Sequence, residues 1–166
     1  MQPQGSSGER DQGSDDASGV HAALLENYAR TQYHYVEFLT THLADCSQAF
    51  GGDLQEMLVL AVIGQVHLRA HLDAARDGSV SRRAGPADRS ISASRLADVT
   101  GIPRQTVRRK LQRLQASGWI EQSPQGRWQL MIDASGVSKA RGAFADLDAR
   151  SMERVARLLV ALKRII

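Results

Sequence analysis

The sequence predicts a mainly α-helical protein with one small β-hairpin. Three observations lead to this fold class. Apolar residues recur every three or four positions over most of the chain, which is the spacing that gives a helix one buried side. Glycines at Gly51-Gly52, Gly101 and Gly118 interrupt this pattern where helices should end. Only the stretch after Gly118 has two short apolar and aromatic runs around a Pro-Gly turn, as a hairpin requires.

The N-terminal part of the chain predicts a tail followed by two helices. Residues 1–19 are rich in Gly, Ser, Gln and Asp, and we expect them to be disordered because they offer almost no apolar surface to bury. A long helix is expected over 20–49 and a second one over 54–75, capped by Asp53. The run 57–63 is apolar nearly all round, so the second helix should lie at the centre of the core.

Residues 91–132 predict a helix, a tight turn and a second helix, followed by the hairpin. Ser92 or Ser94 can cap the first helix through its hydroxyl, and Thr100-Gly101 should end it. The second helix is expected over 103–117, because proline is favoured at the first position of a helix. Two helices joined by a tight turn are typical of a helix-turn-helix, whose second helix fits the major groove of DNA.

The second helix of this pair has one apolar and one basic side. Val107, Leu111 and Leu114 form the apolar stripe, and the opposite side carries arginine, glutamine and threonine without any acid. A solvated surface helix normally mixes both charge signs, so we interpret this side as a DNA-binding surface. Arginine can pair with guanine and glutamine with adenine, and arginine and threonine also bind phosphates. We expect DNA contacts from Arg104, Gln105, Thr106, Arg108, Arg109, Gln112 and Arg113, with bases read by Gln105, Arg108 and Arg109 and phosphates held by Arg104, Thr106 and Arg113.

The predicted hairpin has the position and size of a wing. Its strands are expected at 119–122 and 127–130, joined by the Ser-Pro-Gln-Gly turn at 123–126. Arg127 should stand near the tip, where a wing can contact the minor groove or a phosphate. The fold expected for 91–132 is therefore a winged helix-turn-helix.

The same residues resemble bacterial winged-helix regulators. The run 103–108, with Leu111, Leu114 and Gly118-Trp119-Ile120, is similar to the recognition helix and following strand of GntR-like and MarR-like proteins. A helical segment before this region and a long helix after it match the order of the MarR family, whose first and last helices form a dimer. The resemblance implies a homodimeric, DNA-binding transcription regulator, expected to be a repressor, with room for a small-molecule effector.

Two departures from the MarR pattern are visible. Residues 132–136 match only part of the usual Leu-Thr-x-x-Gly, and the Asp-x-Arg of the wing is missing between Gln122 and Arg127. We therefore identify the chain as a divergent MarR-like protein, with a resemblance that is specific over about 91–120.

The C-terminal helix predicts a dimer interface. Its apolar residues alternate at spacings of three and four, a seam of heptad type. The alternative is intramolecular packing on the helix at 54–75. The seam consists of Met152, Val155, Leu159, Leu162 and Ile166. The expected organisation is a tail (1–19), N-terminal helices for the core and for dimerisation (20–75), a connector (76–90), the winged helix-turn-helix (91–132) and the C-terminal dimerisation helix (133–166).

Charge and composition favour a cytoplasmic, bacterial nucleic-acid-binding protein. Residues 1–72 hold three basic and nine acidic residues (−6), whereas 91–132 hold seven basic and two acidic residues (+5). One part of the molecule should therefore approach a polyanion such as double-stranded DNA. The sequence contains no signal peptide, membrane-spanning run, disulfide framework or catalytic motif. We expect no enzyme activity, cofactor, metal or membrane partner.

Three features leave alternatives open. His67 and His71 have the i,i+4 spacing of a metal pair, but structural histidines are favoured because no further ligand motif accompanies them. Cys46 has no basic neighbour in sequence, so an inert buried thiol is favoured over a redox sensor. Five aromatic residues are close together in the sequence: Tyr28, Tyr33, His34, Tyr35 and Phe38. We favour packing at an interface for them over an effector pocket. A metal- or redox-sensing regulator, and a winged-helix module that binds a protein instead of DNA, are the alternative functions.

Overall fold

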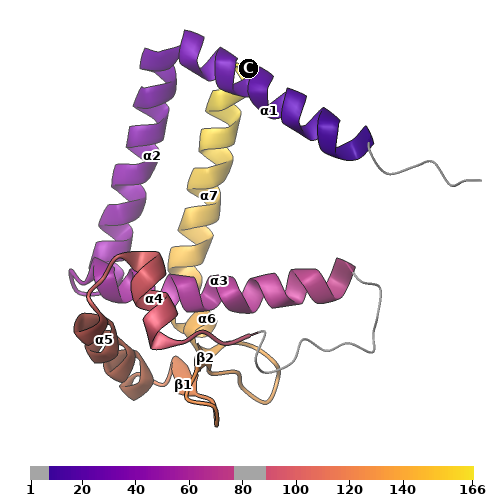
Figure 1. The fold of residues 1–166 in the computed structure, drawn as a ribbon. Helices are drawn as coiled ribbons and strands as arrows, with labels where there is room; N and C mark the ends of the chain where they lie inside the picture. Colours follow the sequence, from indigo (N-terminus) through magenta and orange to yellow (C-terminus); the bar gives the residue numbers. More distant parts are fainter. Residues whose placement is uncertain (1–7, 77–88) are drawn as a thin grey trace, which may run out of the picture. The chain divides into compact units, whose positions relative to one another are not determined.

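The computed structural model describes residues 8–76 and 89–166, and Figure 1 shows their arrangement. It is mainly helical with one small antiparallel hairpin, so the predicted fold class is confirmed. Residues 1–7 of the expected tail and 77–88 of the expected connector lie outside the described residues. The elements are α1 (Gly8–Glu26), α2 (Tyr28–Ala49), α3 (Leu54–Arg76), α4 (Ala93–Thr100), α5 (Arg104–Ala116), β1 (Ile120–Gln122), β2 (Trp128–Leu130), α6 (Lys139–Ala143) and α7 (Ala145–Leu162).

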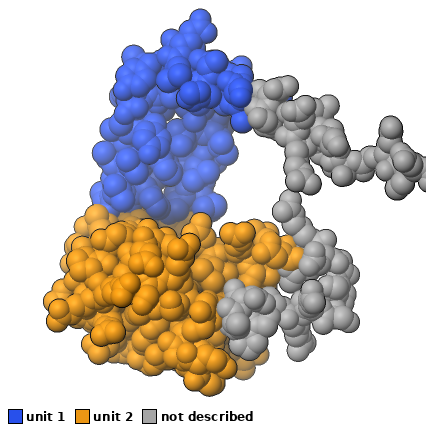
Figure 2. All heavy atoms as spheres, viewed as in Figure 1, with its two compact units in different colours: residues 1–44, 149–166 blue, residues 45–148 orange. Residues whose placement is uncertain are grey.

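The chain divides into two compact units, coloured separately in Figure 2. The first consists of residues 1–44 and 149–166, and the second of residues 45–148. The helical unit, as we call the first, holds α1 and most of α2 and α7. The winged-helix unit, as we call the second, holds α3, α4, α5, the hairpin and α6.

The core of the winged-helix unit is built around α3. Val59 and Ile63 on this helix are completely buried, as are Leu111, Leu114 and Ile120 on the elements packed around it. Burial of a side chain of this size stabilises a fold by roughly 1.5–3 kcal/mol. The prediction that the apolar helix at 54–75 is central is confirmed, because α3 contacts α4, α5 and β2.

Three aromatic side chains close one side of this core. Phe50 stacks on Phe144 with ring centroids 4.7 Å apart, and Trp119 meets Phe144 edge-on at 4.7 Å. Phe50 precedes α3, Trp119 follows α5 and Phe144 lies between α6 and α7. Such aromatic pairs add about 0.5–1.5 kcal/mol each beyond the area they bury. The cluster therefore joins segments that are far apart in the sequence.

The hairpin is a two-stranded sheet to which the segment before α4 adds one isolated bridge. β1 and β2 pair with Ile120 opposite Leu130, and the turn at 123–126 is the predicted one. Ile91, just before α4, then pairs with Trp128 on the other edge of β2 through two backbone hydrogen bonds of 2.9 and 2.8 Å. This bridge, which sequence patterning did not reveal, connects the start of α4 to the wing.

The N-terminal helices differ from the prediction in two ways. The sequence predicts a disordered tail over 1–19, whereas α1 includes residues 8–19. Once the apolar turn around Leu24 is helical, each further residue adds one hydrogen bond at little cost, so the helix can extend into polar sequence. The single helix expected over 20–49 is also interrupted at Asn27, where the Thr31 hydroxyl donates to the carbonyl of Leu24 (3.1 Å).

Within the helical unit, α2 and α7 lie side by side and antiparallel (Figure 1). Ser151 on α7 contacts the Nδ1 atom of His42 on α2 at 3.3 Å, and a shallow pocket between the two helices is lined by Phe38 and Leu158. α7 ends at Leu162, so the expected continuation of this helix to Ile166 is wrong.

Candidate nucleic-acid interface

The turn between α4 and α5 forms as the sequence predicts. Ser92 is the N-cap of α4, because its hydroxyl accepts the amide of Arg95 (3.2 Å). Gly101 ends α4 with a φ of +68°, a conformation that residues with a Cβ rarely adopt. Ile102 is buried at this point, and its amide donates to the hydroxyl of Thr100 (3.3 Å). These contacts set the direction in which α5 leaves the turn.

Helix α5 has one buried apolar side and one exposed side, as the spacing of its apolar residues predicts. Val107, Leu111 and Leu114 are completely buried. A shallow hollow lies on the opposite side, and apart from Pro103 its lining side chains are polar or basic. Among the described residues, Arg104, Arg108 and Arg109 form no ion pair. Five of the eight residues expected to contact DNA line this hollow together: Gln105, Thr106, Arg108, Arg109 and Gln112.

Arg127 does not extend from the wing as expected. Its guanidinium donates to the hydroxyl of Ser90 (3.0 Å) and to the carbonyl of Ser90 (2.6 Å), so the side chain lies against the segment that precedes α4. The reason is the pairing of Ile91 with Trp128, which brings Ser90 alongside Arg127. In this structure the Arg127 side chain binds Ser90, next to the Ile91–Trp128 bridge, instead of projecting from the wing.

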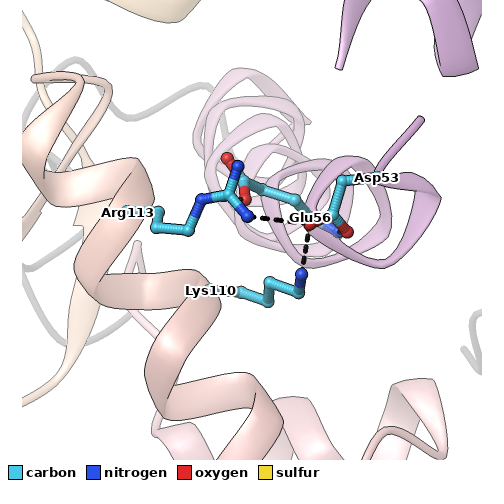
Figure 3. A network of polar contacts seen from close by, with 4 residues as sticks. All are labelled: Asp53, Glu56, Lys110 and Arg113. Carbon is cyan, nitrogen blue, oxygen red and sulfur yellow. Dashed lines mark hydrogen bonds and ion pairs between the residues drawn. The ribbon is translucent and has the colours of Figure 1, made fainter. Parts of the chain in front are cut away.

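Arg113 is also bound by other side chains of the protein, although it is exposed. Its Nη1 atom lies 3.1 Å from Oδ2 of Asp53, and its Nε atom lies 3.1 Å from Oε2 of Glu56 (Figure 3). Lys110, one turn earlier on α5, donates to the same oxygen of Asp53. Lys110 and Glu56 are buried, so α5 is bound to the first turn of α3 by a group of four charges. We call these four residues the α3–α5 charge cluster.

The charge cluster holds Asp53 in its ionised form. Burial by itself raises the pKa of this carboxyl, but the hydrogen bonds from Lys110 and from the amide of Glu56 outweigh it, together with the charges of Lys110 and Arg113. The net result is a pKa below the ordinary value. Asp53 is also the predicted N-cap of α3, since its Oδ1 accepts the amide of Glu56 (3.0 Å).

The two histidines of α3 lie beside a cavity in the winged-helix unit. The Nε2 atoms of His67 and His71 are 3.0 Å apart, and both side chains line a cavity together with Arg141 and Phe144. Burial lowers the pKa of His67, and the charges of His71 and Arg89 lower it further. In the part of the chain that is described, no group of three or more His, Cys, Asp or Glu side chains is arranged for a metal ion.

The predicted aromatic cluster separates into two sets. Tyr28, Tyr33 and Tyr35 are exposed, whereas His34 and Phe38 line the shallow pocket next to α7. Within residues 8–76 and 89–166, the three tyrosines are therefore not packed into a core. Cys46 is buried, with 3% of its surface exposed, as favoured from its sequence neighbourhood.

The predicted C-terminal seam remains largely at the surface of the helical unit. Met152 and Leu159 are 65% and 62% exposed, and Ile166 is 58% exposed. Val155 and Leu162 are half-buried. Within this unit, α7 lies against α2 through Leu158 and Ser151.

A helix-turn-helix with a short wing and an exposed basic second helix defines the class of winged-helix DNA-binding proteins. Residues 78–127 match the model of the MarR family, and this match covers less than half of the chain. The segment is similar to the MarR family of winged-helix proteins, and the predicted resemblance is confirmed. No curated relative and no solved structure matches the chain.

Among the described residues, no single helix is both long and apolar enough to cross a membrane. Helices α2 and α3 pass such a test only when counted together across the break between Ala49 and Leu54, and on length and composition alone.

Proposed function

We propose that the protein is a homodimeric transcription regulator, expected to act as a repressor, that reads a pseudo-palindromic operator with α5 in the major groove. The observation that carries this proposal is the exposed side of α5, where Arg104, Arg108 and Arg109 stand without acidic partners among the described residues. The buried stripe on the other side holds α5 rigidly against α3. Such a helix offers donors to base edges and to phosphates at little entropic cost.

The base-reading residues in this proposal are Gln105, Arg108 and Arg109, beside Gln112. Arg104 and Thr106 hold phosphates near the start of the helix. Arg113 and Arg127 leave the set of DNA-binding residues, because carboxylates bind the first and Ser90 binds the second.

The dimer rests on the exposed apolar residues of the helical unit. A soluble monomer rarely exposes several large apolar side chains on one helix, and α7 exposes Met152, Leu159 and Val160. A two-fold dimer would place two α5 helices on successive half-sites about one turn of DNA apart. We expect Leu159→Glu to lower the molar mass measured by light scattering to that of a monomer, and the exposed Lys163→Glu to leave it unchanged.

An effector in this proposal occupies the cavity beside His67 and His71. Its apolar lining includes Leu60 and Phe144, and Arg141 adds a positive charge at its edge. An apolar pocket with a few polar groups is the usual form of a small-molecule site. A compound that binds there should raise the melting temperature of the protein, and Phe144→Ala should abolish that rise.

The test of the function is a selection of duplexes from a random library at about 150 mM salt, followed by sequencing. Enrichment of a two-fold-symmetric sequence supports the proposal. Arg109→Ala should then weaken operator binding by about 1–3 kcal/mol and relax one position of the site. Arg69→Ala, an exposed arginine on α3, is the matched control and should change neither. A protein that enriches no sequence, yet retains a protein partner, would be an interaction module instead.

A further inference from the structure

The α3–α5 charge cluster joins an exposed arginine to two nearly buried acids. The side chain of Arg113 is 57% exposed, whereas those of Asp53 and Glu56 are 17% and 8% exposed. Lys110 is the second cation, and its side chain is 7% exposed. The side chains of Lys110 and Arg113 extend from α5 towards these two acids at the start of α3, as Figure 3 shows.

Helix capping explains only part of this arrangement. Oδ1 of Asp53 caps α3, but Oδ2 faces Lys110 and Arg113. In a full capping box, the Glu56 carboxylate would accept the amide of Asp53. That amide donates instead to the carbonyl of Phe50 (3.1 Å), and the Glu56 carboxylate faces Arg113. The carboxylate of Glu56 therefore contacts a side chain of α5 and does not cap the N-terminus of α3.

The position of Arg113 gives this contact a consequence for DNA binding. Arg113 lies one turn beyond Arg109, so its exposed guanidinium is on the helix that we propose enters the groove. A phosphate that approached it would compete with two carboxylates that are already 3.1 Å away. Binding to random DNA depends almost entirely on such phosphate contacts, whereas operator binding also depends on base contacts.

We infer that Asp53 and Glu56 are specificity-determining positioning residues. They keep the charges of Lys110 and Arg113 away from DNA phosphates and hold α5 on α3, so that Arg104, Arg108 and Arg109 supply the contacts of this helix. The result is weaker binding to random DNA with little loss at the operator. This inference rests on the proposed function, since it assigns residues that tune the same interface.

The test is the salt dependence of binding to a random duplex, measured by fluorescence anisotropy between about 50 and 200 mM salt. Glu56→Gln loosens Arg113 and should steepen the slope of log affinity against log salt by up to about 0.9, the value of one phosphate contact. The ratio of variant to wild-type affinity then grows up to about 3.5-fold as salt is lowered over this range. The double variant E56Q/R113Q should return to the wild-type slope, and Arg113→Gln alone should leave the slope unchanged.

The matched control is Glu121→Gln, which removes one negative charge from the same unit where the carboxylate accepts from Gln129. An E56Q slope equal to those of wild type and E121Q overturns the inference. A slope that falls by about 0.9 in R113Q also overturns it, because Arg113 would then be a phosphate ligand in the wild type. Should E56Q fail to fold, R113Q decides alone, since this side chain is largely exposed.

Failure of the proposed function is recognised separately. A wild type that enriches no sequence from the library contradicts sequence-specific regulation. The slopes on random DNA still test the charge cluster in that case, because they require no operator.

Discussion

The buried ion pair between Asp53 and Lys110 leads to a prediction about stability: replacing Asp53 should lower the free energy of unfolding more than replacing Lys110. Asp53→Asn leaves the ammonium of Lys110 buried. The asparagine side chain has one oxygen in place of two, so it cannot accept from Lys110 at one position and from the Glu56 amide at the other. Lys110→Met removes the buried cation, and Asp53 keeps Arg113 at 3.1 Å and the Glu56 amide at 3.0 Å. Both side chains of the pair are less than one fifth exposed, so solvent screens them weakly.

The expected magnitudes follow from what each variant leaves behind. An unpaired buried charge costs about 3–5 kcal/mol, so D53N should lower the free energy of unfolding by that amount. Loss of one charge-assisted hydrogen bond costs about 1.5–3 kcal/mol, which is the expectation for K110M. In the double variant no buried charge is left unpaired, and replacing both partners can be nearly neutral. Adding K110M to D53N should therefore recover roughly 2 kcal/mol.

The assay is urea unfolding at one fixed protein concentration, followed by tryptophan fluorescence. Trp119 and Trp128 are the two tryptophans of the chain, and both lie in the winged-helix unit that contains the pair. Equal slopes with urea in the four proteins would show that the same unfolding is being compared. Single-variant losses that simply add in D53N/K110M, or a larger loss in K110M than in D53N, would refute the reasoning.

Three further predictions concern single positions. Leu111→Ala, at a completely buried site, should cost about 2–5 kcal/mol in urea unfolding, and a loss below about 1 kcal/mol would show that the core around α5 is loosely packed. Gly101→Ala should cost about 1–2 kcal/mol because of its φ of +68°, whereas Gly64→Ala inside α3 should be neutral or slightly stabilising. The unfolding free energy should fall as the pH drops below about 6.5, because the lowered pKa of His67 lets the unfolded chain bind the proton first; His67→Gln should reduce this fall, and an unchanged pH profile would contradict the assignment.

Local patterns in the sequence determined the winged helix-turn-helix. The spacing of Val107, Leu111 and Leu114 places them on one side of a helix whatever lies against it, and the structure buries all three. Ser92 and Gly101 mark the ends of α4 by chemistry that acts within four residues. These features can be predicted from the sequence because they depend only on residues that are close together in the chain.

Contacts between distant residues were decided by the tertiary structure. Arg113 looks like a DNA-binding residue in the sequence, because Asp53, which binds it in the structure, lies 60 positions earlier in the chain. Arg127 is likewise bound by Ser90, 37 positions earlier. A basic side chain is available to DNA only when no acceptor in the protein already binds it. The periodicity of a single helix does not indicate whether such an acceptor lies nearby in the folded protein. The sequence by itself therefore determined which helix is basic on its outer side, whereas the packing of α3 against α5 decided which of its charges remain unpaired.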